Sequence, residues 1–137
     1  MEVTLVFPHQ LFAAHPAVGD RRPVYLVEDP LFFGPDPAWP LRFHAQKLVL
    51  HRASMKAYAD RLESGGHEVH YLDCPMDDTV DTGALLESAL PRDISVIHVC
   101  DPVDDVLTRR LRRFADQRGS TLESYPCLLY TSDAADE

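Results

Sequence analysis

Polar or reactive side chains follow the short β-type runs of this sequence, at the points where strands would end. They are His9, Gln10, Glu28, Asp29, Asp73, Cys100 and Asp101. In open parallel sheets, functional groups gather outside the carboxyl ends of the strands, where the strand order reverses. The imidazole of His9 and the amide of Gln10 could hydrogen-bond a heterocyclic ligand, and Glu28 and Asp29 could orient a ligand hydroxyl or bind a metal. Both pairs also have a structural interpretation, because a histidine after a proline often stabilises a loop and carboxylates before Pro30 accept turn hydrogen bonds.

The motifs disfavour several common chemistries. The sequence has no GxGxxG after its first strand and no GxxxxGK followed by serine or threonine, which argues against ordinary dinucleotide and nucleotide triphosphate sites. His44 and His51 lie seven residues apart on one helix face, but no third ligand accompanies them, so we predict no metal site. Cys74, Cys100 and Cys127 form no CxxC pair, which argues against a disulfide framework, and we expect Cys100 to be a small buried apolar residue.

The composition indicates one globular domain. The chain has 137 residues, of which 45% are hydrophobic and 26% charged, and its formal net charge is −9. This acidity argues against a general role in coating nucleic acid. No stretch is long and apolar enough to span a membrane and no leader opens the chain, so we expect a cytoplasmic protein with no membrane partner. The basic residues within 47–56 and 109–113 are expected to face solvent.

A long helix is the element that must position these side chains. Residues 43–66 show unbroken helical periodicity, and the glycines at 65 and 66 end it. Short β-type runs at 24–27 and 67–72 flank the helix, so the three segments predict a βαβ unit. The buried stripe of the helix is expected to consist of Leu48, Met55, Ala59 and Leu62, widened by Ala45 and Val49.

Further strands extend this unit into a sheet. We predict strands at 3–7, 94–99 and 121–125, the last as an edge strand, and a short helix that is capped by Asp81 or Thr82 and runs to Leu90. The next helix ends at Gly119 and has an apolar stripe of Val103, Val106, Leu107, Leu111 and Phe114. Four prolines between 30 and 40 predict an irregular aromatic loop with no regular structure. The fold class is therefore α/β: a three-layer Rossmann-like domain with a five-stranded parallel sheet and helices on both faces.

Residues 127–137 do not continue this pattern. They resemble the in-frame translation of a transposase sequencing adapter, so we interpret them as a non-native tail. We accordingly expect the natural part of the chain to span residues 1–126 and to be a fragment of a longer protein.

Three ordered blocks carry a resemblance to a known family. At residues 7–11 (FPHQL), 24–34 (VYLVEDPLFFG) and 43–58 (FHAQKLVLHRASMKAY), the sequence resembles the photolyase-related branch of the cryptochrome/photolyase family. That branch includes the bacterial (6-4) photolyases with an iron–sulfur cluster. The similarity runs from the amino terminus to about Pro126, and it lies in the order of the blocks rather than in any single residue.

The resemblance implies that residues 1–126 form an amino-terminal antenna domain. In the whole protein, a helical domain with FAD, a 4Fe-4S cluster and the DNA lesion pocket would follow, and this segment alone would not be catalytic. Cys74 and Cys100 would then not be cluster ligands. Repair in the family proceeds by electron transfer from photoexcited reduced flavin to the lesion, and a ribityl-lumazine antenna feeds energy to the flavin. The implied partners are the antenna chromophore, the FAD domain in cis and, through the full-length protein, damaged DNA.

The resemblance also implies a set of antenna-binding residues. Gln10 and a backbone edge would bind the chromophore ring, Glu28 would bind ribityl hydroxyls, and Phe32 or Phe33 would stack on the ring. The complete set is His9, Gln10, Leu11, Glu28, Phe32, Phe33, His44, Lys47 and His51. Two alternatives stay open: a light-sensing cryptochrome without repair activity, and a stand-alone small-ligand or protein-interaction module that uses the loop at 31–39 as its contact surface.

Overall fold

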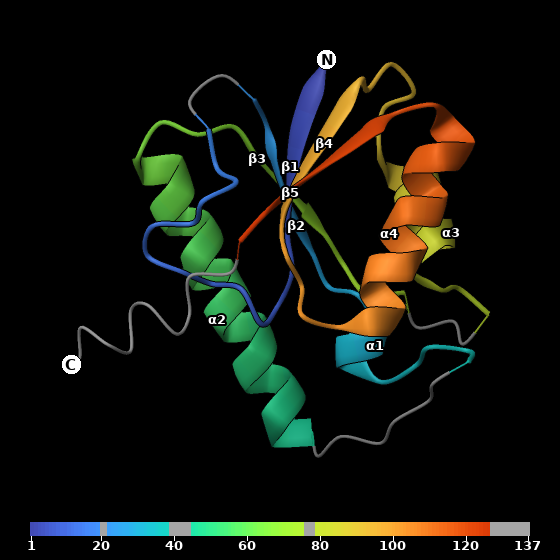
Figure 1. Cartoon of the computed structure of the whole chain (residues 1–137). Helices are drawn as coiled ribbons and strands as arrows, with labels where there is room; N and C mark the ends of the chain where they lie inside the picture. The colour runs from blue at the N-terminus through green and yellow to red at the C-terminus, as the bar shows by residue number, and fades with distance from the viewer. Residues whose placement is uncertain (20–21, 39–44, 76–78, 127–137) are drawn as a thin grey trace.

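The computed structural model describes residues 1–19, 22–38, 45–75 and 79–126. Two strands open this part of the chain with no helix between them, and from the second strand onward helices separate each strand from the next (Figure 1). In order they are β1 (Glu2–Val6), β2 (Val24–Val27), α1 (Pro30–Phe33), α2 (Ala45–Ser64), β3 (Val69–Leu72), α3 (Thr82–Ala89), β4 (Val96–Cys100), α4 (Asp105–Arg118) and β5 (Thr121–Tyr125). No helix among these residues is both long and apolar enough to cross a lipid bilayer.

The five strands form one parallel sheet in the order β3-β2-β1-β4-β5. Residues 2–6 therefore lie at the centre, paired with β2 on one side and β4 on the other. The chain first adds β2 and β3 outward from β1, then crosses back to add β4 and β5, so the strand order reverses between β1 and β4. β5 is an edge strand, as its sequence predicts.

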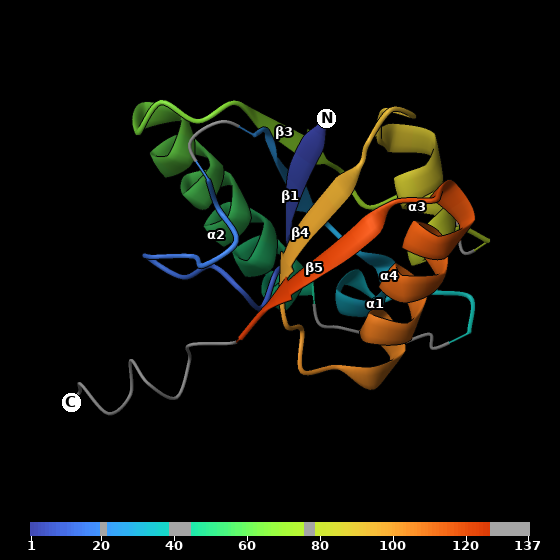
Figure 2. The same ribbon diagram turned by 45° about the horizontal axis from the view of Figure 1, so that its top comes forward.

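Two hydrophobic clusters fill the faces of the sheet. Alternate residues of β1 point in opposite directions, as strand geometry requires: Val3 and Leu5 pack with residues of α3 and α4, whereas Val6 packs with residues of α2. Figure 2 shows α2 on one side of the sheet and α3 with α4 on the other. The predicted fold class, a three-layer α/β domain with a five-stranded parallel sheet, is confirmed.

Helix α2 is the β2-to-β3 crossover, as predicted, and it is longer than the layer it covers. Met55 and Ala59 are buried as expected, but Val49 is 66% exposed, so its assignment to the buried stripe is wrong. The reason is length: a helix of 20 residues measures about 30 Å, whereas β2, with four residues, spans only about 13 Å. The first turns of α2 therefore project beyond the carboxyl edge of the sheet (Figure 1).

The prediction of an irregular loop after β2 is wrong at its start. Residues 30–33 form the short helix α1, because the side chain of Asp29 caps it by accepting from the Leu31 amide and Pro30 occupies the first turn. Proline tolerates that position, since its missing N–H would lack a helical partner there in any case. Gly34 ends the helix at φ 106°, in the left-handed region that favours glycine.

In the second half of the chain, the predicted helix-capping residues are confirmed. Asp81 caps α3, and Gly119 ends α4 at φ 69°. Val103 differs from the prediction, because it precedes α4 instead of joining its buried stripe. Its side chain is 77% exposed and its φ is 54°, a left-handed conformation that is unfavourable for a β-branched residue.

Candidate functional site

The loops that follow β1 and β4 meet at the point where the strand order reverses. The Gln10 side chain is buried, and its Nε2 donates to the carbonyl oxygens of Cys100 at 2.9 Å and Asp101 at 3.3 Å. His9 Nε2 lies 2.8 Å from the carbonyl oxygen of Pro102. A carbonyl only accepts, so this nitrogen carries the His9 proton. The side chains of His9 and Gln10, in the loop after β1, therefore bind the backbone of the loop after β4 across the switch point.

His9 also contacts helix α1. Its ring stacks on Phe32 with centroids 4.7 Å apart and planes 21° apart. Burial lowers the pKa of His9, although the contact with Pro102 partly opposes this. The imidazole is therefore neutral at physiological pH, with Nδ1 available as an acceptor.

A second cluster surrounds the carboxylate at the end of β2. Glu28 is fully buried and accepts from Arg52 Nε at 2.8 Å, Arg52 Nη2 at 2.7 Å, the Cys74 amide at 2.8 Å and the Tyr71 hydroxyl. Burial alone would raise the pKa of Glu28, but these hydrogen bonds outweigh it and the net shift is downward. Glu28 is thus an ionised carboxylate held by four protein donors, and a ligand hydroxyl would have to replace one of them.

The partners of Glu28 all have raised pKa values. The hydrogen bond to Glu28 raises the pKa of Arg52, and burial, followed by the Glu28 hydrogen bond, raises the pKa of Tyr71. Burial also raises the pKa of the Cys74 thiol to about 12. The cluster therefore holds one stable charge pair and no nucleophile, which suits positioning rather than acid–base chemistry.

Aromatic contacts connect this cluster to α1. The Phe33 ring meets His51 of α2 edge-on at 6.0 Å, and the Arg52 guanidinium lies 5.7 Å from the Phe33 centroid. Since Phe32 stacks on His9, α1 contacts the loop after β1 through Phe32 and the cluster around Glu28 through Phe33. Helix α1 therefore lies between the loop after β1 and the overhanging part of α2.

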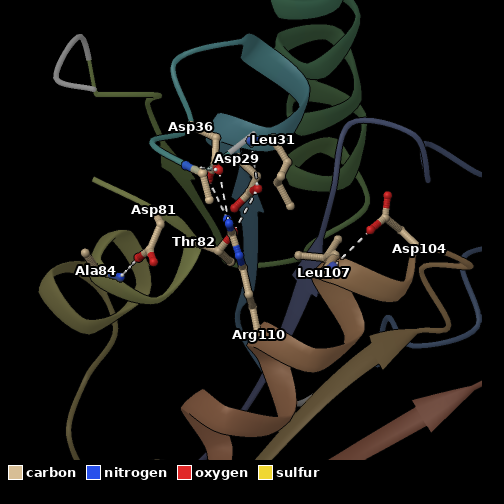
Figure 3. A network of polar contacts seen from close by, with 10 residues as sticks. Asp29, Leu31, Asp36, Asp81, Thr82, Ala84, Asp104, Leu107 and Arg110 are labelled. Carbon is tan, nitrogen blue, oxygen red and sulfur yellow. Dashed lines mark hydrogen bonds and ion pairs between the residues drawn. The ribbon is translucent and has the colours of Figure 1, made fainter. Parts of the chain in front are cut away.

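A third polar network lies on the other side of α1 (Figure 3). Asp29 is buried, and its Oδ2 accepts from the Leu31 amide at 3.1 Å and from Thr82 Oγ1 at 3.0 Å. Arg110 reaches from α4 to the buried carboxylate of Asp36 and makes two hydrogen bonds to it, the longer at 3.0 Å. Arg110 also donates to Thr82 at 3.2 Å. This network ties α1, α3 and α4 together.

The carboxyl group of Asp29 in this network has a pKa that is set mainly by burial. Burial raises this pKa to about 6, against the opposing effects of Thr82, the Leu31 amide and Arg110. Beside the network, a pocket of about 230 Å³ lies between α3 and α4, and its lining includes Asp81, Arg110 and Arg113. Charges of both signs meet there, so the pocket does not single out one class of ligand.

Four buried side-chain atoms of the described residues lack a hydrogen-bond partner. They are Gln10 Oε1, His15 Nε2, Asp29 Oδ1 and His51 Nδ1. Buried polar groups are normally paired, so each unpaired atom indicates a place where water or a ligand could bind. Gln10 and Asp29 follow neighbouring strands and His51 lies near the amino end of α2, so three of the four belong to the carboxyl edge of the sheet. His15 lies in the long loop after β1, where burial lowers its pKa to about 4.

The structure brings together only part of the predicted site. His9 meets Phe32, and Phe33 meets His51, whereas Leu11 is partly buried and packs against the core beneath α2. Lys47 is exposed on the overhang of α2, and His44 lies outside the described residues. Sequence reasoning missed four residues of these networks: Arg52, Tyr71, Asp36 and Arg110. It missed the two arginines because it assigned them to exposed basic clusters. Across the described residues, no group of three or more His, Cys, Asp or Glu side chains could hold a metal ion.

Comparison with known families identifies the class of protein to which this fold belongs. The model of the family described as "Deoxyribodipyrimidine photo-lyase-related protein" matches residues 4–136. The chain therefore belongs to the deoxyribodipyrimidine photo-lyase-related family. This supports the photolyase-related part of the resemblance, while the iron–sulfur (6-4) branch remains a prediction.

Among individual proteins, the chain is similar to an uncharacterised protein of Acanthamoeba polyphaga mimivirus. The two are 32% identical over 126 residues, which cover 90% of this chain and 62% of the viral protein. Weaker similarity extends to an endoplasmin homologue of Hordeum vulgare, at 28% identity over 78 residues, and to heat shock protein 83 of Leishmania donovani, at 22% over 82 residues. These matches cover 57% and 60% of this chain but only 10% and 18% of the two proteins, and they do not show a family.

Proposed function

We propose that this chain is the antenna-chromophore-binding domain of a light-dependent DNA repair enzyme of the (6-4) photolyase type. Membership of the photo-lyase-related family supports the class. The observation that carries the site is the set of unpaired buried atoms on Gln10, Asp29 and His51 at the carboxyl edge of the sheet. That edge is where open α/β sheets bind their ligands.

The chemistry of these residues fits a ribityl-lumazine. Gln10 Oε1 can accept from a ring N–H, and His51 Nδ1 can pair with a ring or ribityl polar atom. Phe32 can offer the ring face that does not stack on His9, whereas Phe33 is buried beneath α2. Glu28 acts indirectly, because its carboxylate holds Arg52 and the Cys74 amide in fixed positions. When bound, the chromophore would absorb light and pass excitation energy to a flavin elsewhere in the protein.

Catalysis in this proposal belongs to polypeptide beyond this chain. The chain spans 62% of the length of the mimivirus relative, so a longer parent protein can carry a further domain. FAD, the 4Fe-4S cluster and the contacts to damaged DNA are assigned to that domain. The residues described above bind and orient the antenna, and they exclude water from it.

Titration of the purified chain with 6,7-dimethyl-8-ribityllumazine, followed by fluorescence anisotropy, tests the proposal. We expect saturable binding, weakened about fivefold by His51→Ala, which corresponds to one hydrogen bond of about 1 kcal/mol. His67→Ala is the matched control, because His67 is a partly exposed histidine beyond the opposite end of α2. Absence of saturable binding to the folded chain would exclude the antenna role, and equal weakening by both variants would exclude this site.

A further inference from the structure

Three polar side chains from neighbouring strands form a continuous set of hydrogen bonds that the antenna site does not use. His98 of β4 is the middle member: its Nε2 lies 2.6 Å from Glu2 Oε1 of β1, and its Nδ1 lies 2.9 Å from the Tyr125 hydroxyl of β5. His98 is only 6% exposed, whereas Tyr125 is half-buried and the Glu2 side chain is 49% exposed. We call these three residues the tyrosine triad.

The tyrosine triad lies on a part of the sheet that α2 does not bury. Ile97 and Val99 pack in the cluster beneath α3 and α4, so His98, between them in the strand, points to the opposite face. The hydrophobic cluster on that opposite face includes residues of β1, β2 and β3 but, within the described part of the chain, none of β4 or β5. The imidazole and the phenol of the triad therefore belong to neither hydrophobic cluster.

The hydrogen bonds fix the tautomer of His98. A carboxylate only accepts, so the proton of the neutral imidazole lies on Nε2 and points at Glu2, and Nδ1 accepts from the Tyr125 hydroxyl. The hydrogen bond to His98 is the largest effect on the pKa of Glu2 and lowers it, so this carboxylate is ionised and holds the ring in one orientation. A nucleophile, a base and a group that orients the base are thus within hydrogen-bond reach of one another.

Another half-buried tyrosine shows what the imidazole adds. The Tyr71 hydroxyl donates directly to the Glu28 carboxylate, with no histidine between them. Burial, followed by this hydrogen bond, raises the pKa of Tyr71 and keeps its phenol protonated. The phenol of Tyr125 instead donates to a nitrogen that can take its proton, and the resulting imidazolium would face a carboxylate.

The charges around the tyrosine triad favour an uncharged electrophile. Glu123 of β5 is opposite His98 in the sheet register, and it is exposed two residues before Tyr125, on the same face of the strand. Arg22 is a positive charge that acts on Glu2, but two of its nitrogens already donate to protein oxygens. Two carboxylates beside an engaged guanidinium disfavour a phosphate ester, so a neutral acyl ester fits this surface better.

We propose that Tyr125 is a nucleophile that accepts an acyl group from an activated ester, with His98 as its general base and Glu2 as a positioning residue. Tyr125 Oη attacks the ester carbonyl carbon while its proton moves to His98 Nδ1. The bond between that carbon and the ester oxygen breaks, and the leaving alcohol takes the proton from Nδ1. His98 is then neutral again and Tyr125 is acylated. This activity is independent of the antenna role and shares no residue with it.

Acetylation by p-nitrophenyl acetate, located by tandem mass spectrometry, tests this inference on the chain of residues 1–137. We expect Tyr125 to be acetylated about 100-fold faster than Tyr71, which is the typical effect of a positioned general base. Tyr125→Phe should remove this label and the matching release of p-nitrophenolate. The rate at Tyr125 should fall in acid, where a second proton on the imidazole of His98 removes the base.

Substitution of two carboxylates on the same face makes the test specific. Glu2→Gln keeps the size of the side chain, but its amide can also donate to His98 and no longer fixes the tautomer, so acetylation of Tyr125 should slow about tenfold. Glu123→Gln removes an equal charge and breaks no hydrogen bond of the tyrosine triad, so it should change the rate less than about twofold. Circular dichroism of both variants verifies that they are folded.

Each outcome decides the inference without reference to lumazine binding. Fast acetylation of Tyr125 that depends on Glu2 and not on Glu123 supports it. Acetylation of Tyr125 no faster than that of Tyr71 overturns it, as does equal slowing in both glutamine variants, which would show a general effect of charge instead of an oriented base.

Discussion

Replacement of Arg52 by methionine tests whether the buried carboxylate of Glu28 is held mainly by charge. Arg52 supplies two of the four donors to this fully buried group, while its own side chain is 47% exposed. Loss of one partner of a buried pair costs about 3–5 kcal/mol. Tyr71 and the Cys74 amide remain in the variant and water can reach the arginine site, so we expect a smaller loss of about 2 kcal/mol.

Urea denaturation followed by far-UV circular dichroism measures this loss. The matched control is Arg109→Met, which removes an arginine–carboxylate pair of 3.4 Å whose two members are both mostly exposed. We expect the control to cost less than about 0.5 kcal/mol. A double-mutant cycle with Glu28→Gln should give a coupling energy of about 1 kcal/mol or more. A loss for Arg52→Met no larger than that of the control would refute the reasoning.

The pH dependence of the same pair has a defined sign. The folded-state pKa of Glu28 is lowered from 4.5, so the ionised carboxylate contributes stability above that value. The contribution disappears as the pH falls through the lower, folded-state pKa. The difference in stability between the wild type and Arg52→Met should therefore be constant near neutral pH and should narrow below pH 4.5. A difference that widens in acid would contradict this assignment.

Substitutions at three further positions have defined expectations. Burial raises the pKa of Asp29 from 3.8 to about 6, so the wild type loses stability as the pH rises through that interval. Asp29→Asn keeps a capping side chain. Between acid and neutral pH, its free energy of unfolding should rise by on the order of 1–3 kcal/mol relative to that of the wild type. A stability difference that does not change with pH would disprove this. Val103→Gly should stabilise the chain by about 1 kcal/mol in thermal unfolding, while Val103→Ala should give no comparable gain. Gly119→Ala should lower the free energy of unfolding by about 1 kcal/mol, because alanine disfavours a positive φ. No atom lies within 4 Å of the added Cβ, so no clash is expected. A much larger loss in urea denaturation would contradict this explanation.

The sequence predicts the fold well because the fold depends on local patterns. The bounds of β2 and β5 agree with their β-type runs, and Asp81 and Gly119 act as the expected caps. The same patterns misplace Val49, because periodicity shows which residues share a face but not whether another layer lies against it. They misplace Val103 because α4 begins only at Asp105. The prolines after β2 obscured α1, since Pro30 begins that helix instead of preventing it.

The site was predictable only in part, because its partners are distant in sequence. The strand-end rule places His9, Gln10 and Glu28 at the carboxyl edge without any knowledge of contacts. It cannot pair Glu28 with Tyr71, 43 residues away, or Asp36 with Arg110, 74 residues away. Those pairs are set by strand order and by the docking of α4, which no local pattern encodes. The binding of a ribityl-lumazine stays a prediction.

The separation of the core into two clusters has a consequence for biosynthesis. The buried residues of the cluster beneath α2 all lie between Val6 and Cys74, whereas the cluster beneath α3 and α4 combines Val3 and Leu5 with residues as distant as Ala115. During translation, the first cluster can therefore assemble as soon as β3 leaves the ribosome. The opposite face of the three-stranded intermediate stays uncovered until β4, α3 and α4 arrive. We expect this nascent half-domain, rather than the finished fold, to be the species most dependent on chaperones.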